Sequence, residues 1–260
     1  MRNLLMTTLL IAFSICAMAN PVKNNPREYY MIQVYHCTSQ KQISTIDAYL
    51  KNTYLPHLHT AGISKVGVFE PVDNDTASDK RLMVWIPLAS INEIDKLDNI
   101  IEQLDPMGNN PVIHLENADS SLPYTRVETT IAKAFKNQPQ FSTKSDLVKS
   151  SARIYEFRSY EGPTEDMYLR KVHMFNEGKE IELFNKLNFN AIFYAKVIAG
   201  NRMPNLVYMT SFNNMDDRNA HWKTFGEDPT WKIISNLPQY LKTISKADII
   251  LMTAKDYADF

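Results

Sequence analysis

Hydrophobic and polar positions alternate along two stretches that lie far apart in the chain. Residues 29–36 (YYMIQVYH) and 154–161 (IYEFRSYE) change character at every second position, which is typical of β-strands. Each stretch leads through a turn into a segment whose apolar residues have helical spacing. Aligning Tyr35 with Tyr160 places the two stretches 125 residues apart. The chain therefore contains a candidate internal repeat.

The same spacing continues to match further along the chain. Strand, strand, helix and strand candidates follow in the first copy at 65–69, 82–88, 91–104 and 125–135, and in the second at 190–194, 206–212, 215–225 and 248–253. With the first strand and helix included, both copies read strand, helix, strand, strand, helix, strand. This is the order of the ferredoxin-like split βαβ unit. We predict an α+β fold made of two tandem ferredoxin-like units.

Each predicted sheet has helices on one face only, so its other face needs a partner. In the first strand, Tyr30, Ile32 and Val34 point one way and Met31, Gln33 and Tyr35 the other. In the second copy, one face holds Tyr155, Phe157 and Ser159, and the opposite face holds Ile154, Glu156, Arg158 and Tyr160. We expect the two sheets to pack together in a dimeric α/β-barrel arrangement, either within one chain or across a homodimer.

The repeat also sets the expected boundaries. We predict a first unit over 27–137, a polar linker with one proline over 138–150, and a second unit over 151–260. The first unit carries a long insertion at 106–124, rich in proline, asparagine and aspartate. Loops of this size are often either functional or merely tolerated.

Residues 1–19 have the composition of an export signal. Arg2 precedes an apolar run, and Ala17-Met18-Ala19 is a small-x-small cleavage motif, so we predict cleavage after Ala19 and a periplasmic or extracellular protein. The run is shorter than the roughly 20 residues that span a bilayer. Lipidation of Cys16 is an alternative, although Ile15 matches that motif poorly. Cleavage leaves Cys37 without an intramolecular partner, and we expect it to be a buried small hydrophobe.

Composition narrows the classes of partner. The 260 residues are 44% hydrophobic and carry a formal net charge of −1, with no long basic stretch. This excludes the electrostatic footprint that nucleic acid or an anionic membrane requires. We expect a globular protein with no nucleic-acid partner and no integral membrane segment once the signal is removed.

Four segments of the second half, RIYEFRSY, KVHMFNEGKEIELF, AGNRMPNLVYMTSF and WKTFGEDPTWK, together resemble the landmarks of NIPSNAP family domains. The resemblance is to exported bacterial proteins with two tandem domains, covers about 27–255 and is strongest over 153–231. It implies the dimeric α/β-barrel superfamily, which includes cofactor-free monooxygenases, haem-degrading enzymes and small isomerases. It supplies no catalytic residues. Relatives often read NEGGE where this chain has Lys179, which should favour continuing the helix.

A histidine and two glutamates stand close together in the segment 171–184. If the helix is straight, His173, Glu177 and Glu180 share a flank beside the core, where they could form a metal site, an acid/base pair or a solvated face. The spacing lacks the HExxH pattern, and the first copy has Ala48, Asn52 and Leu55 at the matching positions, so we expect no metal and no cofactor.

Other polar residues give further candidates. Arg158 and Tyr160 would line the barrel interior if they face the uncovered side of the sheet. We therefore name Tyr160, Arg158, His173, Glu177 and Glu180 as candidate catalytic residues. The remaining histidines are interpreted structurally, with His57 and His59 capping a helix end and His36 and His221 standing alone. Asp228-Pro229 is expected to start a short helix.

Two functional hypotheses remain open. In the first, which the resemblance implies, the protein binds a small hydrophobic or aromatic molecule and acts as a cofactor-independent oxygenase or isomerase. In the second, it is a noncatalytic protein-interaction module whose sheets are consumed by packing. A solvent-reachable cavity bordered by Tyr160 and the His173 flank would favour the first, and a filled sheet interface would favour the second.

Overall fold

The computed structural model describes residues 26–104, 122–142 and 150–259, so the predicted signal peptide and most of the 106–124 insertion lie outside the described residues. The first half contains β1 (Tyr29–Cys37), α1 (Gln40–Tyr49), the π-helical turn η1 (Leu50–Tyr54), α2 (Leu55–Thr60), β2 (Gly67–Pro71), β3 (Lys80–Leu88), η2 (Ile91–Glu93), α3 (Ile94–Gln103) and β4 (Arg126–Ala134). The second half contains β5 (Ile154–Glu161), α4 (Glu165–Asn176), α5 (Glu180–Lys186), β6 (Asn190–Ala199), β7 (Asn205–Phe212), α6 (Met215–Glu227), α7 (Pro229–Ser235), η3 (Pro238–Tyr240) and β8 (Lys246–Ala254).

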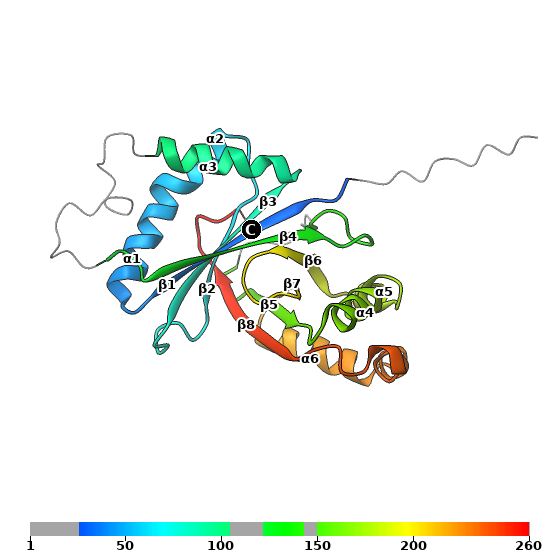
Figure 1. Cartoon of the computed structure of the whole chain (residues 1–260). Helices are drawn as coiled ribbons and strands as arrows, with labels where there is room; N and C mark the ends of the chain where they lie inside the picture. Colours follow the sequence, from blue (N-terminus) through cyan, green and yellow to red (C-terminus); the bar gives the residue numbers. More distant parts are fainter. Residues whose placement is uncertain (1–25, 105–121, 143–149, 260) are drawn as a thin grey trace, which may run out of the picture.

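The eight described strands close into one barrel in the order β1-β3-β2-β8-β5-β7-β6-β4 (Figure 1). All neighbouring strands are antiparallel. Each half keeps its four strands together, as β4-β1-β3-β2 and β8-β5-β7-β6, so the internal order is the same. The halves join edge to edge through β2 with β8 and β4 with β6. Closing the barrel within one chain leaves no free sheet edge between the halves.

The strand registers are also the same in the two halves. Val34 of β1 lies opposite Met83 and Glu128, and Ser159 of β5 lies opposite Val207 and Asp248. Two residues further along, His36 lies opposite Arg81 and Arg126, and Glu161 lies opposite Asn205 and Lys246. The 125-residue spacing therefore relates structurally equivalent positions of β1 and β5.

The barrel interior is apolar at its centre and closed at one end by aromatic rings. Tyr30, Ile32 and Val34 point inward with Tyr155 and Phe157, so the alternation grouped the residues of each face correctly. Trp85 stacks on Phe193 at 5.5 Å between ring centroids, and Phe141 of the segment between the halves packs edge-on against Trp85 at 5.2 Å. These rings fill the end of the barrel where β1 and β5 begin.

Helices cover the outside of the barrel in two groups (Figure 1). Those of the first half bury Tyr35, Leu50 and Leu58 against their sheet, and those of the second half bury Phe175 and Phe184 against theirs. Their starts follow from local sequence, because Ser39, Thr164, Asn214 and Asp228 each accept a backbone N–H of the first turn. The predicted helix start at Asp228-Pro229 is confirmed.

The helix that begins the second half is not straight. α4 ends at Asn176, Lys179 adopts the left-handed conformation with φ 71°, and α5 begins at Glu180. A Cβ on Gly178 would lie 2.6 Å from both the Met174 carbonyl oxygen and the Tyr240 hydroxyl. The backbone therefore passes too close to these groups for a residue with a side chain at this position. The expectation that Lys179 continues the helix is wrong, because packing against Tyr240 overrides intrinsic propensity.

Cys37 ends β1 and is fully buried. Burial raises the pKa of its thiol to about 11, which keeps it protonated and unreactive at neutral pH. The expectation of a buried small hydrophobe is confirmed. Within the described ranges, none of the helices is both long and apolar enough to cross a membrane.

Candidate functional site

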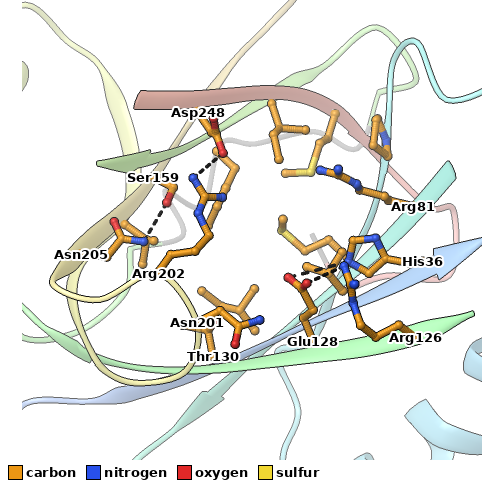
Figure 2. A pocket seen from close by; sticks show the side chains of 18 of the residues that line it. His36, Arg81, Arg126, Glu128, Thr130, Ser159, Asn201, Arg202, Asn205 and Asp248 are labelled. Carbon is orange, nitrogen blue, oxygen red and sulfur yellow. Dashed lines mark hydrogen bonds and ion pairs between the residues drawn. The ribbon is translucent and has the colours of Figure 1, made fainter. Parts of the chain in front are cut away.

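A cavity of about 270 Å³ opens at the end of the barrel where β1 and β5 finish (Figure 2). The wall toward the barrel centre is apolar. It is formed by residues of both halves of the chain, namely Ile32, Val34, Met83, Phe157, Val207, Ile250 and Met252. Polar and charged side chains surround the opening. This combination of a concave apolar wall and a few convergent polar groups is the usual form of a small-molecule site.

The first half contributes a histidine held between carboxylates. His36 Nδ1 lies 2.9 Å and 3.1 Å from the two oxygens of Asp79, which also accepts a 2.8 Å hydrogen bond from Arg81 Nε. Burial raises the pKa of Asp79, but the hydrogen bonds from His36 and Arg81 outweigh it and lower that pKa overall. Asp79 is therefore an ionised acceptor, and Nδ1 of His36 carries a proton.

The other ring nitrogen of His36 faces β4. Glu128 Oε2 lies 3.7 Å from Nε2, which is beyond hydrogen-bonding distance, and Arg126 holds the same carboxylate at 2.6 Å (Figure 2). His36 is only 6% exposed, and Nε2 has no hydrogen-bond partner among the residues that the structure describes. A buried acceptor without a partner is costly, so this atom marks a place for a donor.

The second half contributes a clamped arginine and a buried amide. Arg202, in the turn between β6 and β7, pairs with Glu161 and with Asp248 across the opening from His36 (Figure 2). Asn205 Nδ2 donates to Ser159 Oγ at 2.8 Å. With the amide oriented in this way, Oδ1 of Asn205 is a second buried acceptor that lacks a hydrogen-bond partner within the described part of the chain.

The side chains that line the mouth are more often positive than negative. Among the described residues that line the cavity, Arg81, Arg126, Arg202 and Lys246 are cationic, and Glu128 and Asp248 are anionic. Asp79 and Glu161 pair with Arg81 and Arg202 from beside the cavity, so the charges around the mouth balance. A ligand with hydrogen-bond donors for the two buried acceptors matches this arrangement. The apolar wall toward the barrel centre can accommodate the hydrocarbon or aromatic part of such a ligand.

Arg158 and Tyr160 do not line the barrel interior. Arg158 stacks on Trp222 of α6 at 3.7 Å, pairs with the fully buried Glu156 at 2.5 Å, and donates to Tyr160 Oη at 2.8 Å. Both residues belong to the face covered by helices. The alternation separated the two faces correctly, but it did not indicate which one faces inward, because both faces are buried.

The helix break separates Glu180 from the other two candidate residues of the 171–184 segment. His173 and Glu177 are exposed, with His173 Nδ1 2.8 Å from the Tyr240 hydroxyl. Glu180 is buried and pairs with Lys171 at 2.9 Å, yet burial raises its pKa against the opposing effect of that lysine. The shared flank is therefore not formed. Within the described ranges, no group of three or more histidine, cysteine, aspartate or glutamate residues is arranged to hold a metal ion.

Sequence reasoning missed His36, which was interpreted as a solitary histidine. Its partners come from the β2–β3 connection and from β4, far away along the chain. The available signal was the repeat itself, because correct pairing places His36 beside Arg81 and Arg126. His57 and His59, which were also interpreted structurally, do not line the cavity. His57 Nδ1 lies 2.7 Å from the Thr53 carbonyl oxygen, and His59 pairs with Asp259.

Solved structures show where this fold occurs elsewhere. An anthrone oxidase-like protein matches with a TM-score of 0.56 and 8% identity, over 89% of this chain and 93% of its own. A candidate monooxygenase from Lactobacillus acidophilus matches with a TM-score of 0.52 and 10% identity, over 88% and 94%. At these identities the likeness shows the fold alone. The fold is thus a mixed α/β barrel with an antiparallel sheet, similar to the folds of these two proteins.

Family comparison concerns the second half of the chain. A NIPSNAP family protein from Agrobacterium tumefaciens aligns with 41% of this chain and 96% of its own, at 21% identity and a TM-score of 0.36. None of the curated proteins that were compared matches the chain. The family model for NIPSNAP matches residues 155–259, which contain β5 to β8 and the helices around them. Over residues 155–259, the chain is therefore similar to the NIPSNAP family.

Proposed function

We propose that this protein binds a small molecule with an apolar or aromatic body and at least one hydrogen-bond donor in the mouth of its barrel. The observation that carries the proposal is the apolar-walled cavity of about 270 Å³ with two buried, unpartnered acceptors, His36 Nε2 and Asn205 Oδ1, in the residues that line it. Its volume is near the lower end of ligand pockets, which favours a ligand of one or two rings.

Cofactor-independent oxygenation or isomerisation of such a molecule is the activity that fits this site. Both reactions begin when a base removes a proton and leaves an electron-rich anion, and the arginine side chains of the rim would stabilise that anion. The candidate catalytic positions are accordingly in the barrel mouth. Arg158, Tyr160, His173, Glu177 and Glu180 line no part of this cavity, and they enter the proposal only as support for the second half of the barrel.

We also propose that the chain consists of two tandem units and that it is exported. The matching strand order and register support two tandem ferredoxin-like units, with boundaries near 27–137 and 151–260, that close one barrel. The amino-terminal pattern supports export with cleavage after Ala19. The alternative of a noncatalytic interaction module called for a filled sheet interface. The cavity is not bordered by Tyr160 or the His173 flank, as the first hypothesis expected, but it is open at the barrel mouth, which supports ligand binding.

Two neighbouring residues of β8 allow a matched test. Ile250 lines the cavity, whereas Ile249 points to the opposite face and is 46% exposed. We expect calorimetry to detect binding of 2-naphthol, a two-ring aromatic alcohol, by the wild-type protein. Ile250→Trp should fill the cavity and weaken binding at least about tenfold, and Ile249→Trp should leave affinity unchanged.

Two results would refute binding in the barrel mouth. One is equal affinity of the wild type and Ile250→Trp. The other is the absence of saturable binding by any of a panel of one- and two-ring aromatic alcohols, together with no co-purifying small molecule in mass spectra of the extracted protein.

A further inference from the structure

The strongest chemical feature of the cavity is the orientation of His36. Nδ1 is committed to the ionised Asp79, so the neutral ring has its lone pair on Nε2, at the cavity wall. A carboxylate that holds the far nitrogen fixes both the tautomer and the angle of the ring, and it stabilises the imidazolium that forms after protonation. Asp79 and His36 thus have the geometry of a carboxylate-oriented general base.

Charged groups from every adjoining strand converge on this ring. Asp79 approaches from the β2–β3 connection, Arg81 from β3, and Arg126 and Glu128 from β4. The two arginines compensate the two carboxylates. An additional negative charge on a ligand beside Nε2 would therefore face a new imidazolium and an arginine pair, rather than an excess of carboxylates.

Access to Nε2 depends on Glu128. Its carboxylate lies 3.7 Å from Nε2, and it must move before a ligand hydroxyl can donate to that nitrogen, because the single proton of the hydroxyl cannot also bond to the carboxylate. The Glu128 side chain is 29% exposed and that of its partner Arg126 is 61% exposed. A small rotation toward solvent therefore opens the path and breaks only partly hydrated contacts, which are weak.

We propose that His36 is the proton acceptor of this site and that the ligand is a phenol or an enol. This inference rests on the proposed function. The O–H bond of the ligand breaks, an N–H bond forms at Nε2, and the electron pair remains on the ligand oxygen. The product is a phenolate or enolate paired with the imidazolium, which Asp79 neutralises from the other side. No oxidant or cofactor takes part in this step.

A chromophoric phenol reports the proton transfer directly. 4-Nitrophenol is small enough for the cavity, and its phenolate absorbs at a longer wavelength than the neutral phenol. We expect the full-length protein to lower the apparent pKa of the bound probe, so that the ratio of ionised to neutral probe rises at least about tenfold over that in solution. His36→Gln should retain binding and abolish this rise, and Asp79→Asn should reduce it.

The chain supplies a matched control in His221, which pairs with Asp217 at 3.1 Å outside the cavity. His221→Gln should leave the ionisation of the bound probe unchanged. If His36→Gln does not fold, Asp79→Asn and Glu128→Gln carry the test, because their effects on probe ionisation should have opposite signs. Glu128→Gln removes a carboxylate beside the phenolate and should increase ionisation.

The outcomes separate the two proposals. Absence of probe binding in the wild type contradicts the proposed function as well. Binding without a change in probe ionisation leaves the ligand site intact and overturns the role of His36. An ionisation change that persists in His36→Gln also overturns it, and assigns the effect to the surrounding arginines.

Discussion

The two halves of the barrel share one register and differ in what they bury beneath their helices. On the outer face of β1, Met31 and Gln33 lie in an almost uncharged layer, where Gln33 accepts a hydrogen bond from the Tyr54 hydroxyl. The equivalent positions of β5 are Glu156 and Arg158. Glu156 is fully buried and accepts from Arg158, Arg218 and Trp222 at 2.5–2.8 Å.

At the barrel mouth, by contrast, it is the second half whose charged groups are paired and the first half that has a histidine nitrogen without a partner among the described residues. In the second half, Glu161 and Asp248 are satisfied by Arg202. In the first half, His36 stands at the position of Glu161, and its Nε2 is left without a hydrogen-bond partner in the described part of the chain. Buried charge thus serves packing beneath the helices of the second half, whereas the mouth of the first half contains a histidine nitrogen without a hydrogen-bond partner among the described residues.

The largest effect should come from the buried carboxylate. Glu156→Gln leaves Arg158 and Arg218 without a counter-charge, so we expect a loss of about 3–5 kcal/mol in the free energy of unfolding by urea denaturation. The double variant Glu156→Met/Arg158→Gln copies the first half and should lose less than the single variant. Additive losses would contradict the idea that these residues act as one network.

A smaller effect should come from the helix break. Thr53 lies within the helix of the first half. The equivalent Gly178 has no Cβ, and this lets the backbone approach Met174 and Tyr240 closely. Gly178→Ala should lower the free energy of unfolding by about 1–3 kcal/mol, because the added methyl group must displace backbone. Gly226→Ala is the control, since no atom lies within 4 Å of the added Cβ, and it should stabilise α6 by up to about 1 kcal/mol.

The smallest effect should be on how the free energy of unfolding depends on pH. Burial raises the pKa of Glu156, but Arg218, Arg158 and Trp222 outweigh it and hold that pKa below its ordinary 4.5. The stabilisation is therefore complete above about pH 4.5 and is lost as the pH falls through the folded-state pKa. The stability gap between wild type and Glu156→Gln should narrow only in acid. A gap that stays constant as the pH falls would show that Glu156 titrates alike in the folded and unfolded states.

Much of the fold could be predicted because the 125-residue spacing supplied long-range information that a single pattern lacks. The alternation of β1 separated Tyr30 and Ile32 from Met31 and Tyr35, and the 125-residue spacing identified the equivalent positions of β5. Which face lies inside the barrel was not predictable. Helices bury one face and the opposite sheet buries the other, so residues as polar as Arg158 are enclosed on the outside.

The candidate site was harder to predict, for two physical reasons. His36, Asp79 and Glu128 lie on separate segments and meet only through strand pairing, so no local motif marks them. The His173, Glu177 and Glu180 motif is local, and it fails because Gly178 and Lys179 end the helix between its members. Local spacing is informative only where the backbone stays regular.

Closure of the barrel within one chain has a consequence for how such a site can evolve. In a barrel assembled from two identical subunits, every substitution appears twice, on both sides of the symmetry axis. Here position 36 can be histidine while its counterpart 161 remains glutamate. One side of the mouth is therefore free to acquire reactivity while the other keeps a fixed ion-pair anchor, a division of labour that exact symmetry forbids.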